Sequence, residues 1–104
     1  MHVIIWKYQV KTDRTIEFEQ IYHSNGVWVE LFRKGSGYIN TELLRDKMQP
    51  QRYITIDRWH SAEDYEMFVA KFKKEYETLD AHCKGLTEQE SLLGKWESAN
   101  YETR

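Results

Sequence analysis

The sequence predicts a single α+β domain whose strands and helices follow one another in the order β-α-β-β-α-β. Four segments have the composition and alternation of strands, and two regions between them carry apolar residues at helical spacing. Glycine, asparagine and proline separate these segments, as turn residues do. At 104 residues the chain has the length of one domain. We expect this domain to span residues 1–104, with a core over about 2–97 and a polar C-terminal tail over 98–104.

His2 to Val10 is the first expected strand. Apolar side chains occupy both of its faces: Ile4, Trp6, Tyr8 and Val10 on one, Val3 and Ile5 on the other. A strand that is apolar on two sides is typical of the centre of a sheet. It is therefore predicted to lie between other strands.

A first helical region follows this strand. Thr12 and Asp13 offer capping oxygens for a helix that starts near Arg14. Apolar residues then recur at helical spacing, and Asn25-Gly26 is a natural stop. Val27–Phe32 fits either a strand or a helical turn, and its position directly after a helix favours the turn.

The second half of the chain predicts a hairpin, a long helix and a last strand. The hairpin strands are Tyr38–Asp46 and Arg52–Trp59, because Pro50 excludes the segment between them from a central strand. Ser61 caps a helix whose apolar stripe runs through Tyr65, Phe68, Val69, Phe72, Tyr76, Leu79 and Cys83. A short capped turn at Thr87–Glu90 and a strand over Ser91–Trp96 complete the prediction.

This order is the ferredoxin-like pattern, a four-stranded antiparallel sheet with both helical regions on one face. The helices cover only that face, yet Ile54 and Ile56 alternate with Thr55 and Asp57 along the third strand. The open apolar face needs a partner, and a second copy of the chain would supply one. We therefore expect a homodimer through the open sheet face.

Composition excludes several classes of protein. The net charge of −2 disfavours a nucleic-acid-binding protein, which needs a basic surface. The apolar N-terminal segment is interrupted by Lys7 and is too short for a membrane span. A lone cysteine, Cys83, fits a reducing compartment, so the expected location is cytoplasmic. The histidines show no metal-ligand spacing, and no metal site is predicted.

Several stretches together resemble a known family. They are "FEQIY" followed by Asn25-Gly26, "GYINTELLRD", "RYITIDRW", the Ser61-capped helix and the closing "LLGKWE". In this order and spacing the chain resembles the antibiotic biosynthesis monooxygenase family of dimeric α/β barrels, from about His2 to Glu97. The resemblance implies a dimer whose two sheets face each other and, as in the oxygenases, a pocket between the sheet and the helices of each subunit.

One branch of that family degrades haem, and this chain lacks two of its three features. Trp59 matches the tryptophan that those members place on the third strand. The first strand has no late asparagine, and the helix from Ala62 to Leu79 has no histidine to ligate iron. The resemblance therefore disfavours haem degradation, and no cofactor is expected.

Asp57 and Trp59 are the leading candidates for a site. On one reading the carboxylate of Asp57 lies in a pocket, where partial burial raises its pKa and suits it to act as a base. On the other, Asp57 pairs with an arginine (Arg45, Arg52 or Arg58) and Trp59 fills the core. The alternation of the third strand places both side chains beneath the helices on either reading.

The remaining site candidates are aromatic or hydrogen-bonding residues near this strand. Trp28 and Trp59 are expected as pocket walls, Tyr65 and Phe68 as possible ligand contacts, and His23 and Asn40 as hydrogen-bonding groups. Asn40 faces the pocket in one hairpin register and the other side in the register one residue away.

These observations leave two hypotheses for function. The first is a cofactor-independent monooxygenase acting on a small aromatic or quinone-type compound, with Asp57 and His23 as catalytic candidates. The second is a non-catalytic dimeric module that binds a small apolar ligand or is purely structural. Turnover distinguishes them.

Overall fold

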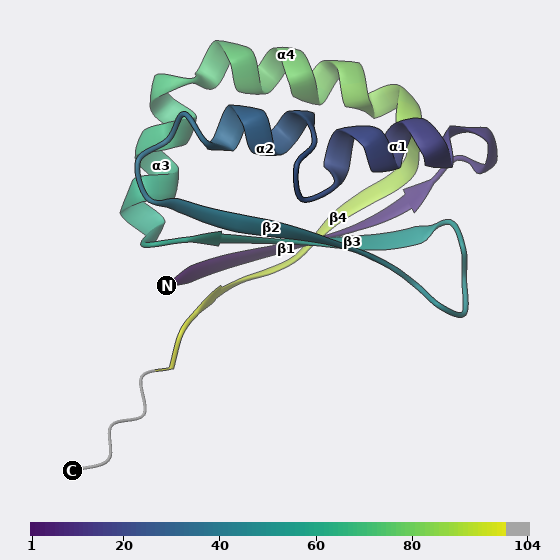
Figure 1. Ribbon diagram of the computed structural model, residues 1–104, viewed down its shortest axis with the longest axis horizontal. Coiled ribbons are helices and arrows are strands. Elements are labelled where there is room, and N and C mark those ends of the chain that lie inside the picture. The colour runs from purple at the N-terminus through teal and green to yellow at the C-terminus, as the bar shows by residue number, and fades with distance from the viewer. Residues whose placement is uncertain (100–104) are drawn as a thin grey trace.

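A computed structural model describes residues 1–99 and confirms the predicted α+β, ferredoxin-like class (Figure 1). The predicted polar tail falls largely on residues 100–104, which lie outside the described part. In chain order the elements are β1 (His2–Val10), a 3-10 turn (Thr12–Arg14), α1 (Thr15–Tyr22), α2 (Val27–Phe32), β2 (Tyr38–Arg45), β3 (Arg52–Trp59), α3 (Ala62–Lys71), α4 (Lys73–Cys83), a second 3-10 turn (Lys84–Leu86) and β4 (Thr87–Glu97).

The sheet is antiparallel throughout, with the strand order β2-β3-β1-β4. The predicted central position of β1 is confirmed. Within the described residues, helices α1 to α4 lie on one side of the sheet (Figure 1). In the β1–β3 pairing Trp6 is opposite Thr55 and Ile4 is opposite Asp57, and these residues face the helices. The structure confirms that Thr55, Asp57 and Trp59 lie beneath the helices.

The segment Val27–Phe32 is helical, as favoured by its position after α1. The predicted capping by Thr12 and Asp13 is wrong, because these residues form a 3-10 turn and α1 begins without a side-chain cap. Gly26 connects α1 to α2 where the chain passes very close to the carbonyl of Ile21. A side chain at this position would collide with that backbone.

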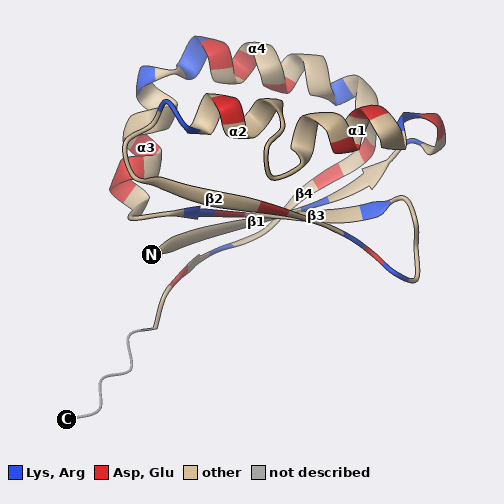
Figure 2. Cartoon of the chain, in the orientation of Figure 1, with Lys and Arg blue, Asp and Glu red and all other residues tan. Residues whose placement is uncertain are grey.

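The second helical region is two helices, whereas the sequence predicted one. The backbone at Phe72 departs from helical values (φ −110°, ψ 28°) and separates α3 from α4. Figure 1 shows α3 standing at one end of the sheet and α4 running above α2. Neither glycine nor proline occupies the bend, so the sequence carried no break signal, and the apolar stripe continues across it. Lys, Arg, Asp and Glu are interspersed along both helices (Figure 2).

The last strand begins at Thr87, four residues earlier than predicted, so the expected turn at Thr87–Glu90 is wrong. The turn instead occupies Lys84–Leu86. The early part of β4 is an edge segment of polar residues that pairs with β1. Such a segment has no apolar alternation by which a strand could be recognised.

A register shift interrupts the pairing of β2 with β3 between Tyr38 and Asn40. Beyond the shift Asn40 is opposite Arg58 and Thr41 is opposite Asp57. The irregularity re-aims β2, so that Tyr38 and Thr41 both lie on the helix side of the sheet. In a regular strand, residues three apart would point to opposite faces.

The opposite side of the sheet, here called the outer face, carries apolar side chains among charged ones. Its charged residues include Lys7, Glu42, Arg52 and Arg58. Its apolar residues are Val3, Ile5, Leu44, Ile54, Ile56 and Trp96. The Trp96 indole lies over Gly94 and remains 56% exposed. None of the helices in residues 1–99 has the length and apolar character needed to cross a membrane.

Candidate active site between the sheet and the helices

A cavity lies between the helix side of the sheet and the helices that cover it. The space open to the centres of water molecules is about 30 Å³, enough for roughly two waters. Any larger ligand therefore requires side chains to move. The lining residues are mostly aromatic with a few polar groups: Ile4, Trp6, Tyr8, Tyr22, Trp28, Phe32, Thr41, Thr55, Asp57, Tyr65, Tyr76, Asp80 and Glu90.

Asp57 is the buried carboxyl group of this cavity, with 7% of its surface exposed. The hydroxyl of Thr41 donates a hydrogen bond to its Oδ1 at 2.6 Å. The hydroxyl of Tyr38 donates in turn to the Thr41 Oγ1 at 2.8 Å. Thr41 is the one side-chain donor to Asp57 within the described residues.

The structure contradicts the alternative in which Asp57 pairs with an arginine. Each candidate arginine pairs with a different carboxylate: Arg45 with Glu19, Arg52 with Asp46 and Arg58 with Glu42. Asp57 is thus a buried carboxyl without a counter-ion in residues 1–99. A charge in this situation is costly, because burial removes its hydration and nothing offsets the loss.

Burial raises the pKa of Asp57 to about 6, although the hydrogen bond from Thr41 opposes the shift. The group can therefore gain and lose a proton near neutral pH, which suits a general base. The surrounding phenols cannot take this role. Burial raises the pKa of Tyr8, Tyr38, Tyr65 and Tyr76, and the charge of Asp57 raises each further. They stay protonated and act as hydrogen-bond donors.

Three of the predicted site residues meet in the cavity: Asp57, Trp28 and Tyr65. Trp28 packs edge-on against Tyr76 with ring centroids 5.1 Å apart. Trp59 and Phe68 do not line the cavity. Trp59 is fully buried behind Tyr65, with centroids 5.4 Å apart, and Phe68 packs against it. Both side chains are part of the core, and Trp59 packs directly behind the cavity-lining Tyr65.

The other two predicted residues lie elsewhere. Asn40 is exposed on the outer face, where its Oδ1 accepts a hydrogen bond from Arg58, because the register shift in β2 turned it away from the cavity. His23 is exposed at the end of α1, and its Nδ1 accepts a hydrogen bond from the backbone N–H of Asn25. That contact closes the turn after the helix and leaves His23 outside the cavity lining.

Sequence reasoning missed the hydroxyl groups of the cavity. Thr41 was hidden by the register shift, which has no signal in the sequence. Thr55 was expected beneath the helices but was not assigned to the site. Tyr8, whose hydroxyl lies 3.1 Å from that of Thr55, could have been found, because adjacent strands place their alternating residues on a shared face. The described residues contain no group of three His, Cys, Asp or Glu that could hold a metal ion.

Comparisons with known proteins agree with this architecture. No curated protein matches the sequence. Among solved structures, a protein from Deinococcus radiodurans described as an antibiotic biosynthesis monooxygenase is 14% identical, with a TM-score of 0.74 over 100% of this chain and 98% of its own. SnoaB, a cofactor-independent oxygenase from Streptomyces nogalater, is 18% identical, with a TM-score of 0.72 over 96% of this chain and 94% of its own. At such identities these likenesses show the fold.

The family is shown by a sequence model. The model of the antibiotic biosynthesis monooxygenase family matches residues 1–73. This range includes β1 to β3 and most of the residues that line the cavity. The match covers well over half of the chain. The chain therefore belongs to the antibiotic biosynthesis monooxygenase family.

Proposed function

We propose that this protein is a monooxygenase that needs no cofactor and acts on a small phenol, hydroquinone or related aromatic compound. The observation that carries the proposal is Asp57, a buried carboxyl without a counter-ion in an aromatic cavity, whose pKa is about 6. Membership of the family and the fold shared with a cofactor-independent oxygenase support the reaction class.

The chemistry assigned to the protein is proton removal and orientation. Asp57 takes a proton from the substrate and leaves an electron-rich anion, which itself reduces oxygen. In the net reaction of an activated CH2 group, the carbon loses two hydrogens and gains one oxygen atom, and the other oxygen atom leaves as water. The aromatic walls hold the ring in place and keep bulk water away, while the neutral tyrosine hydroxyls donate hydrogen bonds to the anion.

Oxygen uptake tests this proposal. The purified protein should consume oxygen with at least one member of a panel of phenols, hydroquinones and anthrone-type compounds, and the product should carry one oxygen atom from ¹⁸O2 by mass spectrometry. Compounds that bind, as judged by quenching of tryptophan fluorescence, without any oxygen consumption would favour the non-catalytic binding module instead.

We further propose that two copies pair through the outer face. Ile56 lies in the middle of that face, opposite Ile5 on one side and Glu42 on the other. A second outer face would cover these apolar side chains.

Replacing Ile56 with lysine should dissociate this dimer. The substitution places a charge in the centre of the proposed interface, where it loses hydration, and the neighbouring Glu42 is already paired with Arg58. We expect the dissociation constant to rise by about 100-fold or more, roughly 3 kcal/mol, as measured by analytical ultracentrifugation. Met67→Lys is the matched control, because Met67 is 68% exposed on α3. A wild-type protein that sediments as a monomer at micromolar concentration would contradict the proposal.

A further inference from the structure

A short chain of hydroxyl groups leads from Asp57 to a second hollow of the protein. The Tyr38 hydroxyl donates to Thr41 at 2.8 Å, and the Thr41 hydroxyl donates to Asp57 at 2.6 Å. The register shift in β2 makes this alignment possible, because it brings Tyr38 and Thr41 to the same face. The alignment of these hydroxyl groups therefore depends on the register shift, because in a regular β2 strand Tyr38 and Thr41 would point to opposite faces of the sheet.

The second hollow is a polar cleft between α2 and the start of β2. The space open to the centres of water molecules is about 190 Å³ there, much more than in the cavity. Its lining residues are Ser24, Val29, Arg33, Gly35, Tyr38, Ile39 and Asn40. Tyr38 lines only this cleft, whereas Thr41 and Asp57 line only the cavity. The hydroxyl chain therefore spans the wall between the two.

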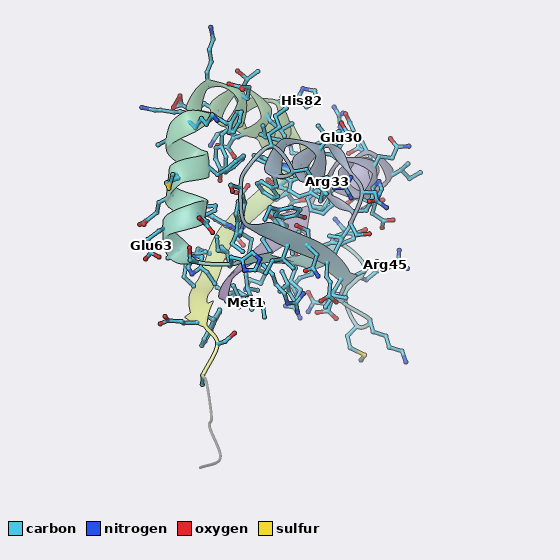
Figure 3. The ribbon with its side chains drawn as sticks, turned by 60° about the vertical axis from the view of Figure 1, so that its left-hand side comes forward. Met1, Glu30, Arg33, Arg45, Glu63 and His82 are labelled. Carbon is cyan, nitrogen blue, oxygen red and sulfur yellow. The ribbon has the colours of Figure 1, made fainter. Side chains whose placement is uncertain are left out.

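Arg33 lies near Tyr38, at the outer end of the hydroxyl chain. It follows α2 and lies above β2 (Figure 3). Its guanidinium partly offsets the rise that burial causes in the pKa of Tyr38, so its positive charge acts on the hydroxyl of that residue.

We propose that Thr41 and Tyr38 form a proton relay that connects Asp57 with solvent in the cleft. Its task rests on the proposed function: a substrate that fills the narrow cavity closes the direct route to water, and a base that is 7% exposed then needs another exit for the proton it has taken.

The transfer balances along the chain. Once Asp57 is protonated, the two hydroxyls rotate to donate toward the cleft. Asp57 then gives its proton to the Thr41 oxygen, Thr41 passes its own hydroxyl proton to the Tyr38 oxygen, and Tyr38 releases its proton to a water or buffer base in the cleft. Three O–H bonds break and three form, and no residue on the path ends with a changed charge except Asp57. The transfer leaves Tyr38 donating to Thr41 and Thr41 donating to Asp57, which is the arrangement in the structure.

The relay can be tested without turnover by following Asp57 after a rapid pH jump, in oxygen-free protein saturated with a phenol of the panel, so that the cavity is filled and its direct route to water is closed. Infrared spectroscopy with ¹³C-labelled aspartate reports the protonated carboxyl band, which Asp57→Asn identifies by its loss. Tyr38→Phe should slow protonation of Asp57 on the order of 10-fold, less than the roughly 10²-fold or more of a positioned proton donor, because waters partly replace the hydroxyl. Thr41→Val should slow it likewise, and Thr41→Ser, which keeps the hydroxyl, should restore the rate.

The controls separate conduction from positioning. Tyr53→Phe removes a hydroxyl on β3 that bonds to Glu19 instead, and it should leave the rate unchanged. Tyr38→Phe keeps the bond from Thr41 to Asp57, so a slower rate with a nearly unchanged titration midpoint indicates a relay. Protonation as fast as in the wild type would overturn the inference. The result is independent of oxygen uptake, so failure of the relay and failure of the proposed function are distinguishable.

Discussion

Asp57→Asn should abolish turnover while the protein stays folded. Asparagine has nearly the same shape as aspartate and can still accept the hydrogen bond that Thr41 donates at 2.6 Å, but it cannot take a proton. Loss of a general base typically lowers kcat about 10²- to 10⁴-fold, and we expect a fall in this range with KM little changed. Oxygen uptake with the best substrate of the panel measures both constants.

The pH dependence provides a second test of the same role. A base works only when deprotonated, so wild-type kcat should rise with pH through the region of the Asp57 pKa, about 6 in the free protein. The residual activity of Asp57→Asn should lack this rise. Asp13→Asn, in the exposed turn before α1, controls for the loss of one carboxylate. An Asp57→Asn protein that keeps more than about a tenth of wild-type kcat would show that another group removes the proton.

Much of the fold could be predicted because burial on two sides leaves a direct signature in a strand. The alternation of Ile4, Trp6 and Tyr8 with Val3 and Ile5 fixed β1 at the centre of the sheet. The bend at Phe72 could not be predicted in this way. Phe72 is apolar and compatible with a helix, and the apolar residues before and after it keep the spacing of a helix. Only the backbone at Phe72 departs from helical values.

The site could be predicted only in part, for a related reason. Asp57 was found because β3 alternates regularly, so its face follows from its position in the strand. Thr41 and Asn40 exchanged places because one irregularity in β2 reverses which residues face the helices. Whether Asp57 meets an arginine depends on where Glu19, Glu42 and Asp46 lie in space, and these residues come from α1 and from β2 with the residue that follows it.

Asp57→Asn should also stabilise the protein at neutral pH. The pKa of Asp57 is raised from 3.8 to about 6 in the folded state, so folding favours its protonated form. The stability that this group contributes is therefore fully present below about pH 4 and is lost as the pH rises through 6. A shift of this size corresponds to roughly 3 kcal/mol. The variant should exceed the wild type by up to about that amount at pH 7 and match it near pH 4.

Urea unfolding of both proteins at these two pH values, at one fixed protein concentration, measures the difference. Comparing the two proteins cancels the titration of the other carboxylates, so only Asp57 should contribute to the change between pH 4 and pH 7. Equal stability at pH 7 would show that the buried carboxylate of Asp57 is solvated or paired in solution. Its pKa would then not be raised, and Asp57 would not be suited to act as the base. A large gain would mean that the fold tolerates a destabilising charge beside its aromatic core. Packing alone gives no reason for such a charge, whereas proton removal from a bound substrate does.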